Sequence, residues 1–169
     1  MDFFLDSGVF LGLCDHKDDW HKESKSLLER HPRQTNNYYS AKKVKDELKM
    51  NRLQIIKKGY DNEALSWIYK CIKRRLRQMK KLIEYENKKH VQFNPLFGDI
   101  VKITDYAKND AIIVTNAIFW SYRCGSSRDP TLISTDKKHI VSKADRIIEE
   151  AEAKCNRTIP LKIISLEDI

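Results

Sequence analysis

Short apolar runs and longer helical patterns alternate along this chain. Four short runs predict strands, at residues 3–5, 36–39, 131–134 and 161–165, and the apolar run at 3–5 predicts a buried one. The segments between them predict helices: a short one around residues 9–13, one that stops before Pro32, one capped by Ser40, and two across residues 103–124 and 145–155. Strands separated by helices, without hairpin signals, form parallel sheets that are covered on both faces. The pattern therefore predicts a three-layer α/β/α sandwich with a mostly parallel sheet.

The middle of the chain, from about residue 60 to 98, is helical and basic. Apolar residues recur at helical spacing and predict one helix over residues 63–93 with a core-facing stripe. The opposite side carries exposed cations, namely Lys70, Lys73, Arg74, Arg77, Lys80 and Lys81. A solvated face is the ordinary explanation for charged helix surfaces, but charges of one sign disfavour a helix. We expect this face to bind nucleic acid, with an acidic protein partner as the alternative.

Size and charge narrow the function further. A chain of 169 residues suits a single domain, here residues 1–169 with a helical insertion at about 60–98. The net charge of +8 and a pI near 9.3 indicate an anionic partner, either nucleic acid or a membrane surface. The longest apolar stretch, residues 111–120, is too short to span a bilayer, so we expect no membrane association.

The N-terminus and the cysteines indicate the compartment. The chain enters a predicted strand at once, with Asp2 where a signal peptide would carry basic residues. The four cysteines are far apart and form no CxxC pair, which predicts reduced, mostly buried thiols. Both features predict a cytoplasmic protein.

Four carboxylates stand in settings that favour a shared site. Asp6 and Asp136 follow predicted strands, whereas Glu47 and Asp110 lie near the starts of predicted helices. In open α/β sheets, functional groups gather at the carboxyl ends of strands and at the adjacent helix starts. Acids that meet there repel one another, and a divalent cation with a preference for hard oxygen ligands would relieve the repulsion. The arrangement predicts a Mg²⁺ or Mn²⁺ site for metal-assisted phosphodiester hydrolysis.

In the third predicted helix, two neighbouring acids compete for the site. At about 100° per residue, Glu47 lies on the same side as Val44 and Leu48, whereas Asp46 points nearly opposite to Val44. The buried face is the one that reaches a strand end. We therefore predict that Glu47 is the ligand and that Asp46 is solvated.

The other acids also have alternatives. Asp6 and Asp136 could simply cap the turns that follow them. A carboxylate in the first turn of a helix is favoured by the helix dipole, so Asp110 has a structural explanation too, and Asp105 is its fallback. Asp129 competes with Asp136, but it precedes a proline in a polar turn, where Asp is common.

The same residues carry a resemblance to a known family. The segments FFLDS, VKDEL, DAIIVTNA and LISTD occur in the order and context of the four motifs of the PIN-domain ribonucleases, the group that includes the VapC toxins. The resemblance covers residues 1 to about 50 and 100–169. It implies a metal-dependent endoribonuclease that uses Asp6, Glu47, Asp110 and Asp136. Hydroxyl groups of Ser7, and of Thr135 or Ser134, would support the site.

The resemblance leaves three functional hypotheses. The chain is an RNA-cleaving enzyme, a PIN-like module that binds RNA or protein but cleaves weakly, or the toxin of a pair inhibited by an antitoxin. PIN-like proteins are often dimers, so a homodimer is also expected. His139 follows Asp136 by three residues and is a further, less favoured candidate for the site.

Overall fold

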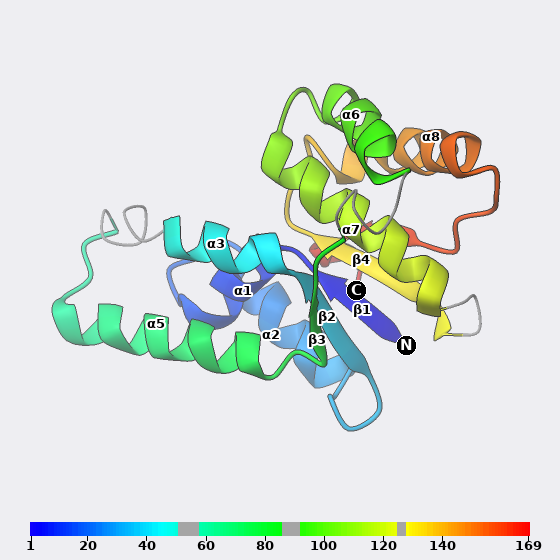
Figure 1. Ribbon diagram of the computed structural model, residues 1–169. Helices are drawn as coiled ribbons and strands as arrows, with labels where there is room; N and C mark the ends of the chain where they lie inside the picture. The colour runs from blue at the N-terminus through cyan, green and yellow to red at the C-terminus, as the bar shows by residue number, and fades with distance from the viewer. Residues whose placement is uncertain (51–57, 86–91, 125–127) are drawn as a thin grey trace.

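The computed structural model describes residues 1–50, 58–85, 92–124 and 128–169 (Figure 1). The described strands form one five-stranded sheet in the order β3-β2-β1-β4-β5, and every neighbouring pair is parallel. They are β1 (Asp2–Leu5), β2 (Asn37–Ala41), β3 (Lys81–Ile83), β4 (Pro130–Ser134) and β5 (Lys162–Ser165). The predicted α/β class and parallel sheet are confirmed.

Helices cover both faces of this sheet. They are α1 (Ser7–Cys14), α2 (His21–Arg30), α3 (Lys42–Met50), α5 (Asn62–Arg77), α6 (Phe93–Ile103), α7 (Lys108–Cys124) and α8 (Ala144–Cys155). Helices α1, α2 and α5 lie on one side, and α6, α7 and α8 lie on the other (Figure 1). Helix α3 follows β2 and contacts both α1 and α7. The result is the predicted three-layer sandwich.

The central strands are buried along their whole length. Each residue of β1 and β4 is buried, as expected for parallel strands with helices on both faces. Helix α7 is also apolar on most sides, and Ala111, Val114 and Ile118 have no exposed surface. No helix within the described ranges has both the length and the apolar composition needed to cross a membrane.

The strand order places a topological switch point between β1 and β4. The chain moves outward from β1 to β2 and β3, then returns to pair β4 with the other side of β1. The main-chain N–H of Asp6 donates to the carbonyl of Ile133 at 3.1 Å, so the ends of the two strands are joined. Ligand sites of open α/β sheets lie in the crevice beyond such adjacent carboxyl ends.

One helix prediction was wrong in extent. Helix α5 ends at Arg77, whereas the periodicity predicted a helix over residues 63–93. Residues 81–83 instead form the edge strand β3, which pairs in parallel with Tyr39–Ala41 of β2. The Lys80 N–H also donates to the Tyr38 carbonyl at 2.8 Å. Pairing with a distant strand overrides local helix propensity here; the part of the prediction on residues 86–91 lies outside the described residues.

Two smaller predictions can also be compared with the structure. Ser40 does not cap the third helix, because β2 continues to Ala41 and the Ser40 hydroxyl donates to the Leu5 carbonyl at 2.7 Å. Cys14, Cys71 and Cys155 are free and buried, as predicted. The side chain of Cys124 lies outside the described part of the chain.

Candidate metal centre

Asp6 lies at the switch point, at the end of β1 and the start of α1. Its side chain is 3% exposed, and it accepts hydrogen bonds from the Ser7 main chain, the Ser7 hydroxyl at 3.2 Å and the Ser134 hydroxyl at 2.6 Å. Burial raises the pKa of this carboxyl, and the hydrogen bonds from Ser134 and Ser7 offset part of the rise. Asp6 therefore caps α1, and its carboxylate also lies at the carboxyl ends of β1 and β4, the edge of the sheet where the sequence predicted the site.

Glu47 points inward from α3, and its neighbour points outward. Glu47 is 9% exposed and shares its side of the helix with the buried Val44 and Leu48. Asp46 is exposed and lies 3.6 Å from the Lys49 ammonium. The predicted helix rotation is confirmed. Burial raises the pKa of Glu47, a hydrogen bond with Ser7 lowers it, and the charge of Asp6 raises it again.

Asp110 lies in the first turn of α7 and faces the other acids. Burial and the charges of Asp6, Asp136 and Glu47 raise its pKa to about 7, well above its ordinary value of 3.8. Asp105, the fallback candidate, is exposed and forms an ion pair with Lys143. The structure thus brings Asp110, rather than Asp105, to the acidic edge.

Asp136 is held at this edge by the residues around it. Its main-chain N–H donates to the Ser134 hydroxyl at 3.0 Å, and its carboxylate accepts the His139 N–H at 2.8 Å. The His139 Nδ1 lies 2.9 Å from the second Asp136 oxygen. Candidate ligand atoms of Asp110, Asp136 and His139 all lie within 4.8 Å of one another. The competitor Asp129 precedes β4, at the opposite end of that strand, and pairs with Lys162 at 2.6 Å.

The first turn of α1 lies very close to the segment after β4. A Cβ atom on Gly8 would be 1.8 Å from the Thr135 hydroxyl oxygen, so only glycine fits without displacement. Thr135 thus packs against Gly8, and it is Ser134 that hydrogen-bonds to Asp6. Sequence reasoning left these two hydroxyl residues open and ranked His139 low, although the i,i+3 spacing of Asp136 and His139 was visible.

The chemistry of these donors fits a divalent cation. Four carboxylates from β1, α3, α7 and the end of β4 act on one another electrostatically, and three of them have raised pKa values. A bound cation favours the ionised form of each acid and would remove this penalty. Carboxylate oxygens are the ligands that Mg²⁺ and Mn²⁺ prefer. The ligand atoms that come together in the described part of the chain are those of Asp110, Asp136 and His139, and Asp6 and Glu47 act on Asp110 electrostatically.

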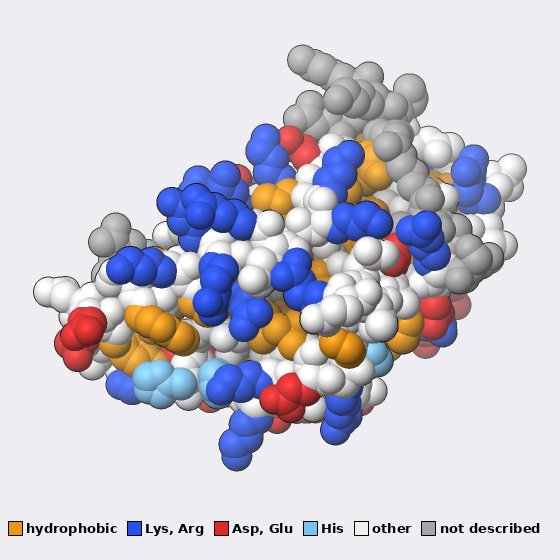
Figure 2. Space-filling view, turned by 90° about the horizontal axis from the view of Figure 1, so that it is seen from below, with side chains coloured by type: hydrophobic (Ala, Val, Ile, Leu, Met, Phe, Trp, Pro, Cys, Tyr) orange, Lys and Arg blue, Asp and Glu red, His pale blue; other side chains and the backbone are white. Residues whose placement is uncertain are grey.

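The predicted basic face lies on α5 and the segment after it. Figure 2 shows Lys and Arg side chains gathered on the side of the molecule that is at the bottom of Figure 1. The six predicted cations are all exposed: Lys70, Lys73, Arg74, Arg77, Lys80 and Lys81. Helix α3, which carries Glu47, lies between α5 and α7 in Figure 1.

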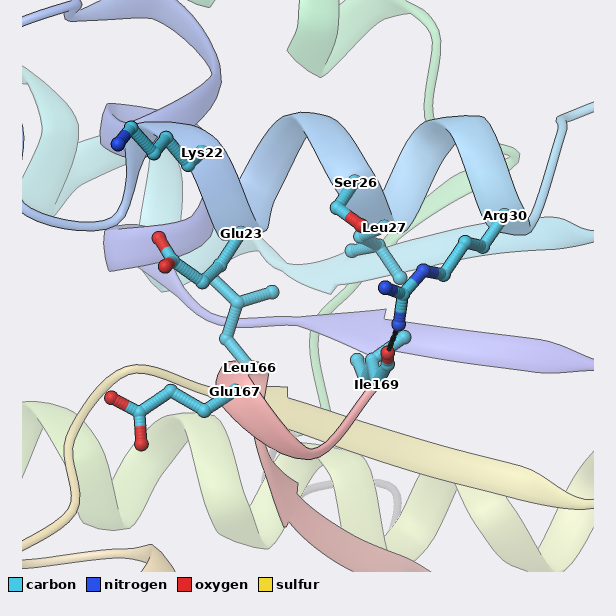
Figure 3. Close-up of a pocket in the computed structure, with 8 residues that line it drawn as sticks. All are labelled: Lys22, Glu23, Ser26, Leu27, Arg30, Leu166, Glu167 and Ile169. Atoms are coloured by element: carbon cyan, nitrogen blue, oxygen red, sulfur yellow. Dashed lines mark hydrogen bonds between the residues drawn. The ribbon is translucent and has the colours of Figure 1, made fainter.

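A separate hollow of about 220 Å³ lies between α2 and the short 3₁₀ helix η3 (Leu166–Asp168) (Figure 3). In Figure 3 the Glu23 and Glu167 side chains extend on one side, and the Arg30 guanidinium donates to the Ile169 carbonyl on the other. One Glu23 oxygen is buried without a hydrogen-bond partner among the described residues. None of the four acids lines this hollow, so it is not part of the candidate centre.

Comparisons with known proteins bear on the fold. No protein-family model matches the sequence, and no curated protein matches it. Among solved structures, the chain is similar to one in the crystal structure of VapBC2 from Rickettsia felis bound to a DNA fragment from their promoter. The TM-score is 0.54, the two chains are 13% identical, and the match covers 98% of each. The chain therefore shares the fold of this VapBC2 chain along nearly its whole length.

Proposed function

We propose that this protein is a PIN-like endoribonuclease that uses Mg²⁺ or Mn²⁺ to hydrolyse RNA phosphodiester bonds. The observation that carries the proposal is the convergence of Asp6, Glu47, Asp110 and Asp136 at the switch point of a parallel sheet. The electrostatic strain among these acids supports a cationic ligand, and the fold shared with VapBC2 supports the PIN-like class.

In this proposal the bound ion supplies the chemistry, and the residues around the acids orient them. When bound, the divalent ion supplies positive charge that stabilises the charge building on a scissile phosphate and lowers the pKa of water. Ser7 and Ser134 fix the orientation of Asp6 through hydrogen bonds. His139 does the same for Asp136, because it occupies one oxygen through its main chain and the other through its ring. Such contacts orient the ligands and typically raise metal affinity.

The direct test is an RNA cleavage assay with Mg²⁺, with Mn²⁺ and with EDTA. We expect wild type to cleave only with an ion, and Asp6→Asn and Asp136→Asn to lose cleavage while keeping the circular dichroism spectrum. Asp19→Asn is the matched control, because this acid is exposed and is not one of the four. Wild-type rates in both site variants would refute the metal-centre assignment. RNA binding by wild type without cleavage would favour the binding-module hypothesis.

The α5 face is proposed to hold the RNA backbone. Changing Arg74 and Arg77 of α5 and Lys81 of β3 to Gln keeps good helix formers in α5 and alters exposed positions only. If these side chains neutralise phosphates, each lost contact should flatten the salt dependence of RNA affinity by roughly 0.7 of a log unit per log unit of salt. Affinity should fall equally for unrelated sequences. If RNA affinity depends on salt with the same slope in wild type and variant, this face does not bind RNA. A protein partner would then be the better explanation of its charge.

A second candidate function is that of a toxin inhibited by an antitoxin. The fold shared with a chain of VapBC2 favours it, because the motifs of this chain resemble the family that includes the VapC toxins. An apolar groove between α3 and α5, rimmed by Lys45, Lys49 and Lys73, could receive an acidic inhibitor. Expression in a bacterial host should then arrest growth, and Asp6→Asn should relieve the arrest. Normal growth at high wild-type expression would refute a toxin role.

A further inference from the structure

A hollow of about 320 Å³ lies between α3, the end of β3, α6 and α7. Its volume is at the lower end of the roughly 300–1,000 Å³ typical of small-ligand sites. Aromatic rings from Tyr85, Phe93 and Phe97 line it together with Ile83 and Ile112. Aromatic and aliphatic side chains thus form part of the wall, and the volume suits one planar group.

The rings are arranged as a stack with an accessible outer member. The centroids of Phe93 and Phe97 are 6.3 Å apart, and their planes differ by 15°. Phe93 is buried and packs on Phe119 at 5.6 Å, whereas Phe97 is only partly buried. A further planar group could therefore extend the stack at Phe97.

None of the four acids lines this hollow, but its lysine acts electrostatically on Glu47. Lys43, which lines it, precedes Glu47 by one turn of α3, and its charge lowers the pKa of Glu47. Lys43 therefore links the hollow to the neighbourhood of the candidate centre.

The charges at the rim favour an anionic, planar ligand. Lys43 is half-buried, and across the described ranges no ion pair joins it to a carboxylate. The two acids of the rim are already engaged, since Asp46 pairs with Lys49 at 3.6 Å and Glu84 pairs with Lys42 at 2.8 Å. An ammonium and an aromatic ring in one hollow suit a nucleotide, with its phosphate on the lysine and its base on the ring.

We propose that this hollow is a nucleobase subsite, in which the base next to the scissile phosphate stacks on Phe97 while Lys43 holds a neighbouring phosphate. The proposal rests on the proposed nuclease function and names its substrate class. A base within a duplex is paired and stacked between neighbours, so it enters such a hollow only from a single strand. The preferred substrate is thus single-stranded RNA.

The walls of the hollow are held in place before any ligand binds. The Asn116 side chain accepts the Tyr85 N–H at 2.7 Å and donates to the Ile112 carbonyl at 2.8 Å, so it joins two of the lining segments. A pre-formed platform loses little conformational entropy when a base stacks on it. Phe97 can therefore be changed without removing the supports of the hollow.

The test measures binding, not cleavage, in the Asp6→Asn background. The probe is a fluorescein-labelled oligoribonucleotide of about eight nucleotides, alone or annealed to its complement, at fixed salt. We expect tighter binding of the single strand, a loss of at least about fivefold for it in Phe97→Leu, and little change for the duplex. Phe97→Tyr keeps the ring and should keep the affinity.

The outcomes separate this proposal from the nuclease function. Equal single-strand affinity in Phe97→Leu, equal losses in Leu and Tyr variants of unchanged melting temperature, or no measurable single-strand binding would each overturn the subsite. If wild type cleaves RNA but the Leu variant binds normally, the nuclease function is supported and the nucleobase subsite is refuted. If wild type does not cleave RNA but binding still depends on the Phe97 ring, the subsite is supported and the nuclease function is refuted.

Discussion

Replacing Asp110 by Asn should stabilise the metal-free protein above neutral pH. Burial and the charges of three other acids raise the pKa of Asp110 from 3.8 to about 7. The folded state therefore holds a proton that the unfolded chain has already released at pH 5 or 6. Stability is unaffected below about pH 3.8, falls as the pH rises towards 7, and stays reduced above it. An amide carries no charge, so the variant should escape this loss.

The size of the effect follows from the same pKa. Each pKa unit corresponds to about 1.4 kcal/mol. The raised pKa of Asp110 therefore lowers the free energy of unfolding by at most about 4 kcal/mol. Asp110 is partly exposed, and solvent screens its interactions. The amide also loses a favourable charge at the start of α7, worth up to about 1 kcal/mol. A net gain of about 2 kcal/mol remains, or roughly 4–8 °C in melting temperature for a chain of this length.

Thermal unfolding in EDTA at pH 5 and pH 8 measures the stability gain of Asp110→Asn. Wild type should lose stability between the two pH values, and Asp110→Asn should lose less. Asp46→Asn, an exposed acid outside the cluster, is the control and should follow wild type. Added Mn²⁺ should raise the melting temperature of wild type at pH 8 but not that of Asp110→Asn. If Asp110→Asn and wild type have equal melting temperatures at pH 8 in EDTA, the acids do not share the strained cluster described above.

Two further predictions concern neighbouring positions. Glu47→Gln should reduce cleavage strongly and Asp46→Asn hardly at all, because only Glu47 faces the cluster; metal-titrated kinetics with the opposite ranking would place the ligand one residue earlier. Gly8→Ala should destabilise the fold by about 1–3 kcal/mol in urea unfolding, because its Cβ would clash with the Thr135 hydroxyl. Thr135→Ala should restore part of that stability in the double variant, and a fully additive loss would contradict the contact.

The sequence allowed the sheet and the acids to be predicted because both rest on local patterns. Strands buried on both faces are continuous apolar runs, and β1 and β4 have that form. Helical rotation separated Glu47 from Asp46, since Val44 and Leu48 marked the buried side.

Features that depend on distant partners were not predictable in the same way. Strand β3 has only three residues, and its existence follows from pairing with β2, so the local pattern suggested a longer helix instead. The hydrogen bond from the Ser134 hydroxyl to Asp6 depends on the register of β1 against β4, which the local sequence does not reveal. The aromatic hollow joins residues from α3, β3, α6 and α7, and no single segment reveals it.

The strain at the acidic edge is itself an argument about function. The apolar core needs no carboxylate at the ends of β1 and β4, and the raised pKa values of Asp6, Glu47 and Asp110 mean that these acids lower the stability of the metal-free protein at neutral pH. Caps alone would not require four acids from four elements, because one carboxylate satisfies the start of α1. Contacts with Ser7, Ser134 and His139 fix the direction of two of the carboxylates. An edge that keeps several carboxylates close together and oriented, at the expense of stability, is best explained by a cation that binds among them.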